Sequence, residues 1–285
     1  MSIKKYLDKT PDLTGKKVIV TGGTSGIGLA LVKHLLYKNA TVVIMARNLK
    51  KAEEVRNNLL ADYLDKTITI IKYDQSDDQS IKEACTTIIN EHRDFYALVL
   101  NAGIFQSKKK MTYVDDIPLT IKTNYVGVKT ILDNLLPRLH EEHRLILQGS
   151  VVASWRNKKI DSLKTKKLSS FQQYIISKSG VEALFYHYSN LDNCPCSFYL
   201  VEPGLTNSEI IRDFPTPIKQ MGHVFLKVAS HSVNKAALTA LYALDPYVEK
   251  NAFIVPRGLF SCMGYPKIRK FPKKRRRENL YNLLG

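Results

Sequence analysis

Short apolar runs alternate with longer helical patterns along most of this chain, and this alternation limits the folds open to it. The helical patterns include residues 28–38 and 78–92, whose apolar side chains share one face. Each right-handed crossover between parallel strands returns through a helix, so the pattern predicts an α/β fold with a doubly wound parallel sheet and helices on both faces. About seven strands are expected, since seven runs have the near-continuous hydrophobicity of strands buried on both sides: 17–21, 41–46, 67–73, 96–101, 144–148, 197–201 and 252–255.

The composition agrees with such a fold. The chain has 285 residues, of which 44% are hydrophobic and 24% charged, and no linker or repeat interrupts it, so we predict a single domain over 1–285. It has no run of about 18 uncharged apolar residues, and its first residues lack the apolar core of a secretory signal, so we expect a cytoplasmic protein. The four cysteines match no zinc spacing, which predicts ordinary thiols and no metal site.

A glycine-rich segment joins the first predicted strand to the first long helix. It reads Gly22-Gly23-Thr24-Ser25-Gly26-Ile27-Gly28. Glycine permits positive φ in a tight strand-to-helix turn, and without a Cβ it lets a pyrophosphate approach the backbone. The following helix offers N–H groups and the positive end of its dipole to that anion. The segment therefore predicts a dinucleotide-binding loop rather than a purely structural turn.

With Thr21, this loop resembles the T-G-x-x-x-G-[IL]-G motif of the classical short-chain dehydrogenases/reductases. The resemblance implies a Rossmann-type fold, a nicotinamide cofactor and a homodimer or homotetramer. Two features, the long insert 155–169 and the residues around Asn124, resemble those of the family branch that contains retinol dehydrogenases and enzymes related to protochlorophyllide reductase. Between residues 15 and 208 the family's other motifs follow in order: Asp74 at the adenine-contacting position, Asn101-Ala102-Gly103 as N-A-G, Asn124-Tyr125-Val126-Gly127 as N-x-x-G, Tyr174 to Lys178 as Y-x-x-x-K, and Pro203-Gly204 as P-G.

The end of the second predicted strand distinguishes NAD from NADP. An acid there binds the ribose 2′-hydroxyl, whereas an arginine favours a 2′-phosphate. The turn has Arg47 and no acid, and a guanidinium suits phosphate, so we predict NADP(H) as the preferred cofactor. NAD(H) stays the alternative, since Arg47 could be merely solvated and some NADP-dependent relatives have a basic residue in place of Ser25. The expected cofactor contacts are Gly22, Thr24, Ser25, Gly26, Ile27, Gly28, Arg47, Asn48, Asp74, Asn101, Ala102, Gly103, Tyr174, Lys178, Pro203 and Gly204.

Tyr174 and Lys178 lie four residues apart in a helical pattern that begins near residue 169, where Gln172 or Gln173 can complete a capping box. Positions i and i+4 share a helix face. A lysine charge held about 4 Å away contributes on the order of 4 kcal/mol at an effective dielectric of ~20. That would lower the pKa of the tyrosine by about three, to near 7, where an acid/base catalyst works best.

Two further residues complete the expected catalytic set. In the family, a serine after the fifth strand holds the substrate oxygen, and Ser150 is the candidate, with Ser154 as the alternative if the register slips. By the same resemblance, Asn124 holds a water that links Lys178 to solvent. Asn124, Ser150, Tyr174 and Lys178 together imply that hydride passes between NADP(H) and a carbonyl or alcohol carbon, while Tyr174 moves the proton.

Basic residues stand out elsewhere, and the formal net charge is +17. A cluster of eight lies in 266–277, either as a solvated tail or as a peripheral contact with anionic membrane, and the insert 155–169 is also basic. Residues 205–230 occupy the family's substrate-lid position, and their apolar content indicates a partly apolar small-molecule substrate. An NADP-sensing or nucleic-acid-associated regulatory protein is the alternative, which the complete catalytic set disfavours, so nucleic acid is not an expected partner.

Overall fold

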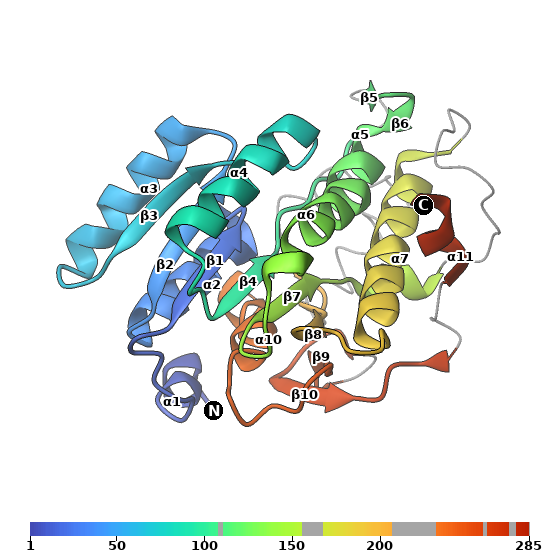
Figure 1. Cartoon of the computed structure of the whole chain (residues 1–285). Helices are drawn as coiled ribbons and strands as arrows, with labels where there is room; N and C mark the ends of the chain where they lie inside the picture. Colours follow the sequence, from blue (N-terminus) through green and yellow to red (C-terminus); the bar gives the residue numbers. More distant parts are fainter. Residues whose placement is uncertain (108–110, 156–167, 207–231, 259–260, 274–277, 285) are drawn as a thin grey trace.

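Eight strands form the main sheet of the computed structural model, which describes all residues except 108–110, 156–167, 207–231, 259–260, 274–277 and 285 (Figure 1). Their order is β10-β9-β8-β7-β4-β1-β2-β3, and every neighbouring pair is parallel except β9 and β10. This confirms the predicted doubly wound sheet. The strands are β1 (Lys17–Thr21), β2 (Thr41–Ala46), β3 (Ile68–Lys72), β4 (Ala97–Leu100), β7 (Arg144–Gln148), β8 (Ser197–Val201), β9 (Phe253–Pro256) and β10 (Pro266–Arg269).

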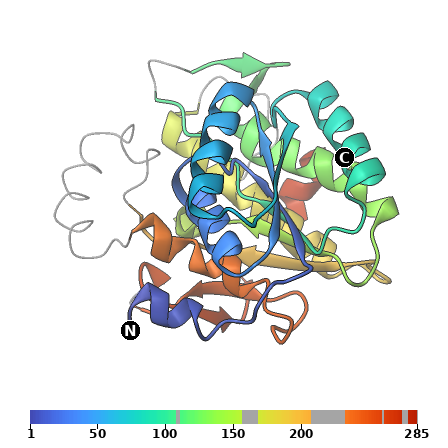
Figure 2. The same ribbon diagram turned by 90° about the vertical axis from the view of Figure 1, so that its left-hand side faces the viewer.

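Helices cover both faces of the sheet because successive strand residues point to opposite sides (Figures 1 and 2). In β1, Ile19 packs into the core beneath α4, α6 and α7, whereas Val18 and Val20 pack beneath α2, α3 and α10. The six helices are α2 (Gly26–Tyr37), α3 (Leu49–Asp62), α4 (Asp78–Glu91), α6 (Gly127–Leu135), α7 (Ser170–Ser189) and α10 (Leu238–Tyr242).

Shorter elements connect these layers. A two-stranded sheet of β5 and β6 stands apart from the main sheet, and a wide π-helical turn, η2, joins α5 to α6. These elements are α1 (Ile3–Leu7), β5 (Tyr113–Val114), β6 (Ile117–Pro118), α5 (Leu119–Ile121), η2 (Lys122–Val126), η3 (Leu136–Arg138), η4 (Val151–Trp155), α9 (Val233–Ala236), α11 (Glu278–Tyr281) and η8 (Asn282–Leu284).

The basic segment 266–277 is not simply a solvated tail. It begins as β10, which pairs antiparallel with β9 and adds an eighth strand to the seven predicted. Phe271 then packs against Phe185 and Phe253, and farther on the Tyr125 hydroxyl donates a hydrogen bond to the Leu280 carbonyl. Apolar side chains between the charges therefore attach this end of the chain to the body; residues 274–277 lie outside the described part.

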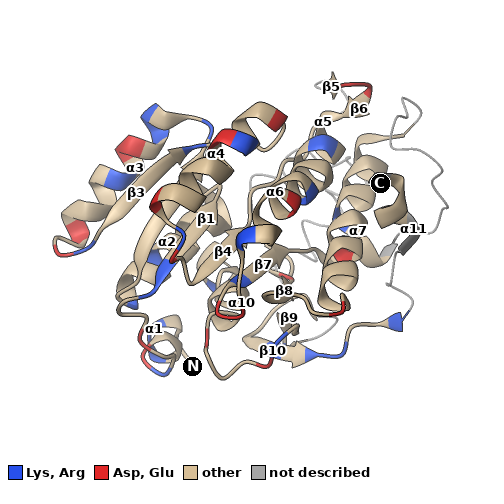
Figure 3. Ribbon diagram, in the orientation of Figure 1, with Lys and Arg blue, Asp and Glu red and all other residues tan. Residues whose placement is uncertain are grey.

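Charged side chains lie mostly on the helices and loops around the sheet rather than along its central strands (Figure 3). In the part of the chain that the structure describes, no helix is long and apolar enough to cross a bilayer. All four cysteines remain thiols there. Of the regions singled out in the sequence, residues 156–167 of the basic insert and 207–230 of the expected lid lie outside the described residues.

Candidate active site

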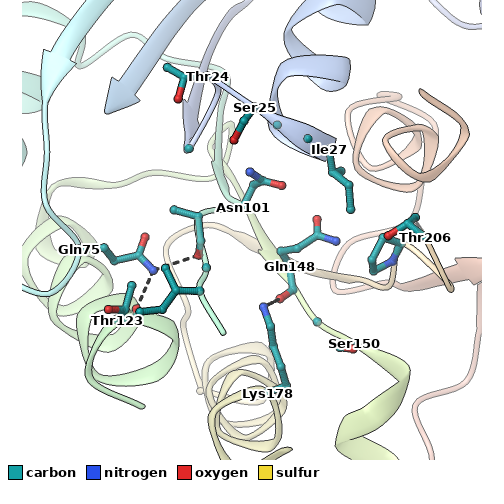
Figure 4. A pocket seen from close by; sticks show the side chains of 18 of the residues that line it. Thr24, Ser25, Ile27, Gln75, Asn101, Thr123, Gln148, Ser150, Lys178 and Thr206 are labelled. Atoms are coloured by element: carbon teal, nitrogen blue, oxygen red, sulfur yellow. Dashed lines mark hydrogen bonds between the residues drawn. The ribbon is translucent and has the colours of Figure 1, made fainter. Parts of the chain in front are cut away.

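A cavity of about 510 Å³ opens at the carboxyl ends of the parallel strands, where the strand order reverses between β1 and β4 (Figure 4). In open α/β sheets this is where ligands bind. All sixteen residues predicted to contact the cofactor line the cavity, and so does Ser150. The structure thus gathers segments from six strand ends into one site. Of the predicted site residues, only Asn124 is not part of the lining.

The loop after β1 has the shape of a phosphate cradle. Gly22 has φ +69°, which favours glycine, and a Cβ on Gly28 would lie 2.3 Å from the Gly22 carbonyl oxygen. Asn101 fastens this loop to the end of β4 by donating from Nδ2 to the Thr21 carbonyl at 3.0 Å. Ser25 is the N-cap of α2, so the unpaired N–H groups of the first helical turn meet the cavity beside it. The segment can therefore hold an anion by its backbone.

The end of the cavity formed after β2 and β3 carries exposed charges. The Arg47 side chain is 68% exposed, and its Nη1 lies 3.9 Å from the Asp74 carboxylate. Asp74 also accepts hydrogen bonds from the backbone and hydroxyl of Ser76. Lys51, which the sequence analysis missed, lines the same end; its position four residues after Arg47, in the first turns of α3, was the available signal.

The opposite end of the cavity is buried and carries the hydroxyl groups. Tyr174 lies on α7, is 7% exposed, and shares a hydrogen bond with Ser150. The predicted capping box is present: Ser169 Oγ accepts from the Gln172 backbone, and the Gln172 side chain accepts from Ser169. It fixes the first turn of α7 just before Tyr174, which sets the direction in which the tyrosine enters the site.

The expected pKa of Tyr174 is wrong for this structure. Burial raises it to about 12, although the hydrogen bond with Ser150 opposes this. Burial also lowers the pKa of Lys178 to about 8, and its Nζ donates to the Gln148 carbonyl at 2.9 Å. The loss of water around both groups outweighs the attraction that the i, i+4 spacing suggested. Tyr174 is therefore protonated at neutral pH.

The two candidate serines differ clearly in position. The Ser154 hydroxyl donates to the Val151 carbonyl at 2.7 Å inside η4 and does not line the cavity, whereas Ser150 does. This geometry favours Ser150 as the residue that meets a substrate oxygen.

Asn124 lies outside the cavity lining and holds together two segments that border the cavity. It lies in η2, 1% exposed, and its Nδ2 donates to the Ile104 carbonyl at 2.8 Å and to Ser177 Oγ at 3.1 Å, while its Oδ1 accepts from the Ile104 N–H at 2.8 Å. These bonds use both amide hydrogens to hold the loop after β4 against α7. The proposed role of Asn124 in a proton relay stays a prediction.

Several lining residues were missed from the sequence. Gln75 joins two loops through hydrogen bonds from Nε2 to the carbonyls of Ala102 and Thr123, at 3.2 and 2.7 Å (Figure 4). Thr206 lines the wall formed after β8, and Gln148 lines the floor at the end of β7. A polar residue directly after the apolar run Leu145-Ile146-Leu147 was the signal for Gln148.

Comparison with known proteins agrees with this geometry. The family model for short chain dehydrogenases matches residues 16–216, so the chain belongs to that family of oxidoreductases, whose members bind a nicotinamide cofactor and act on small molecules. An uncharacterized oxidoreductase of Schizosaccharomyces pombe is 33% identical over half of this chain, a match that spans 41% of that protein. A short-chain dehydrogenase/reductase of Armillaria gallica is 29% identical, covering 84% of this chain and 80% of that one.

The expected similarity to retinol dehydrogenases is also confirmed. Human retinol dehydrogenase 11 is 26% identical over 71% of this chain and 65% of its own length. Among solved structures, a short chain dehydrogenase from Burkholderia cenocepacia in complex with NADP has a TM-score of 0.66 at 23% identity, covering 82% of this chain and 92% of that one. At that identity the likeness supports the fold.

Proposed function

We propose that this chain is an NADP(H)-dependent oxidoreductase that transfers hydride between the nicotinamide and a carbonyl or alcohol carbon of a partly apolar small molecule. The observation that carries the proposal is the hydrogen-bonded pair of Ser150 and Tyr174, with Lys178 one helical turn away, in the cavity that also holds the glycine cradle. Phosphate binding and proton transfer then fall at opposite ends of one site.

The residues present fit a dinucleotide with a 2′-phosphate. Gly22 and Gly28 let the loop pack closely against itself and against Asn101, while Gly26 has no protein atom within 4 Å of the place where a Cβ would lie. The backbone of this loop is therefore open to a pyrophosphate at Gly26. Arg47 and Lys51 supply positive charge at the exposed end, opposite Asp74, which suits a phosphorylated ribose next to an adenine. A nicotinamide at the buried end would supply or accept the hydride.

The protein groups at the buried end support reduction of a carbonyl. Tyr174 is protonated at neutral pH, with a pKa raised to about 12, and can donate its proton to the substrate oxygen. Ser150 can donate a second hydrogen bond to that oxygen as negative charge develops on it. Lys178, whose pKa burial lowers to about 8, retains its proton at pH 7, so it can offer a positive charge to the tyrosinate that remains after proton transfer.

Apolar side chains next to Tyr174 support a substrate with an apolar part. Phe105 meets the Tyr174 ring edge-on, with centroids 5.7 Å apart, and Val152 packs in the same small cluster. Retinol dehydrogenases, named for an apolar alcohol, are among the relatives. We therefore infer a ketone or aldehyde with a hydrophobic body, and its alcohol as the product.

The test is a titration of the purified chain with NADPH and NADH, followed by turnover on a panel of apolar ketones, aldehydes and carboxylated ketones. We expect tighter binding of NADPH and turnover of at least one apolar carbonyl. More efficient turnover with NADH would contradict the assignment of Arg47. Tight NADPH binding without turnover of any carbonyl would favour the regulatory alternative.

The wider setting follows from the same proposal. We propose that residues 1–285 act as one cytoplasmic domain in a homodimer or homotetramer, which light scattering of the purified chain would test. Peripheral contact of 266–277 with anionic membrane also stays a prediction, and its test is sedimentation with anionic vesicles.

A further inference from the structure

The Gln148 side chain is a buried polar group that the roles above do not use. The residue is 6% exposed, and neither its Nε2 nor its Oε1 has a hydrogen-bond partner among the described residues. Leaving both ends of a primary amide unpaired in a protein interior is costly, so such a group in a native structure needs an explanation. Nothing in the backbone requires glutamine at the end of β7, where the preceding residues are apolar.

The place of this amide points to a ligand. Gln148 lines the cavity, and its side chain extends toward the wall formed by Ile27 and Thr206 (Figure 4). Its backbone carbonyl accepts the hydrogen bond of the Lys178 ammonium at 2.9 Å, which fixes it to the catalytic end of the site. Ser150, the residue expected to hold the substrate oxygen, follows two residues later in the chain and lines the same cavity.

A dinucleotide bound as the proposed function requires brings one primary amide, the carboxamide of its nicotinamide ring, to the buried end of the cavity. The hydride carbon of the nicotinamide ring must approach a carbonyl held by Ser150 and Tyr174, and the carboxamide is attached to the adjacent ring carbon. A primary amide has donors and an acceptor, as Gln148 does, so the two can form a pair of reciprocal hydrogen bonds.

Resting on the proposed function, we propose that Gln148 binds the carboxamide of the nicotinamide ring and thereby sets which face of the ring turns toward Tyr174. Gln148 is thus a positioning residue for the cofactor. The same cavity contains a natural contrast in Gln75, whose amide nitrogen already bonds to the carbonyls of Ala102 and Thr123.

The test compares cofactor fragments by equilibrium binding, with Gln148→Met as the variant, since methionine keeps the shape of the side chain and removes the amide. We expect NADPH to bind about tenfold more weakly to the variant, because two neutral hydrogen bonds are lost. The fragment 2′-phospho-ADP-ribose, which lacks the nicotinamide, should bind the variant and the parent equally. The parent should prefer NADP⁺ to its 3-acetylpyridine analogue, which lacks the amide donor, and Gln148→Met should lose that preference.

Thermal unfolding of the same proteins separates this role from a structural one. We expect Gln148→Met to be at least as stable as the parent, because it removes an unpaired buried amide. Gln75→Met should be less stable yet keep the preference for the carboxamide. Unchanged NADPH affinity in Gln148→Met, or an equal loss of affinity for 2′-phospho-ADP-ribose, would overturn the role of Gln148 and leave the proposed function standing. Failure of the parent to bind either NADPH or the fragment would overturn the proposed function as well.

Discussion

The two ends of the cavity each carry a positive charge, but the two charges differ in their exposure to solvent. The Arg47 side chain is 68% exposed, whereas Lys178 is 5% exposed. At the exposed end solvent screens the charge, so Arg47 can distinguish ligands only by a modest free energy. At the buried end the loss of water decides the protonation of Lys178 and Tyr174. The exposed end is therefore suited to cofactor selection and the buried end to proton transfer.

Removal of the Tyr174 hydroxyl should have the largest effect on activity. We expect Tyr174→Phe to lower kcat by about a thousandfold, since it removes the proton donor while leaving the ring and its contact with Phe105. NADPH binding, measured by fluorescence, should persist. The control is Tyr186→Phe on the same helix, which keeps the stacking of that ring on Phe271. Turnover by Tyr174→Phe close to that of the control would remove Tyr174 from the mechanism.

The two serines provide the next comparison. Ser150→Ala should lower kcat by about a hundredfold, because a hydrogen bond to the developing oxyanion is lost. Ser154→Ala removes only the bond to the Val151 carbonyl and should leave kcat within about twofold of the parent. Steady-state kinetics on one substrate measures both variants. If Ser154→Ala were the slower of the two, the register after β7 would be wrong.

A buried lysine without a carboxylate nearby should cost stability. Among the described residues no acid lies within ion-pairing distance of Lys178, whereas Lys122, buried to the same degree, has Asp78 at 2.8 Å. The fall in the pKa of Lys178 from 10.5 to about 8 corresponds to about 3 kcal/mol at pH 7. We expect Lys178→Met to raise the free energy of unfolding of the cofactor-free protein by up to about that amount while abolishing turnover. Lys122→Met should give no gain.

The pH dependence of this effect has a defined sign. Because the folded pKa of Lys178 lies below its unfolded value, the penalty is complete below about pH 8 and disappears as the pH rises toward 10.5. The advantage of Lys178→Met in urea unfolding should therefore shrink across that window. An advantage that stayed constant with pH would point to packing instead of charge.

The fold could be predicted from the sequence wherever a strand is buried on both faces. β1, β4 and β7 each contain at least three consecutive buried apolar residues, and their positions followed directly. β10 was missed because it is short and half charged: Lys267 and Arg269 make the segment look like a basic tail. β3, at the other edge of the sheet, was found because it is rich in isoleucine. Pairing with β9 and the burial of Phe271 depend on distant residues, which local patterns do not show.

The residues of the site also divide into those that the sequence identifies and those that only the folded chain reveals. The sequence identified the residues whose role depends on their spacing along the chain, such as Gly22, Gly28 and the Tyr174–Lys178 pair. The pKa of Tyr174 could not be predicted in this way, because it depends on burial and on the hydrogen bond with Ser150. The unpaired amide of Gln148 was missed for the same reason, since burial becomes visible only in the folded chain.

Arg47 gives the smallest effect and the clearest test of the exposed end. We expect Arg47→Ser to weaken NADPH binding about tenfold and to leave NADH binding unchanged, because only NADPH carries the 2′-phosphate. The control is Lys50→Ser, an exposed cation on α3 that does not line the cavity. Since Arg47 is exposed, its effect should fall as ionic strength rises from about 0.05 M to about 0.5 M. Equal weakening of NADPH and NADH, or an equal effect of Lys50→Ser, would mean that Arg47 adds only to the general positive field and that cofactor preference is determined elsewhere.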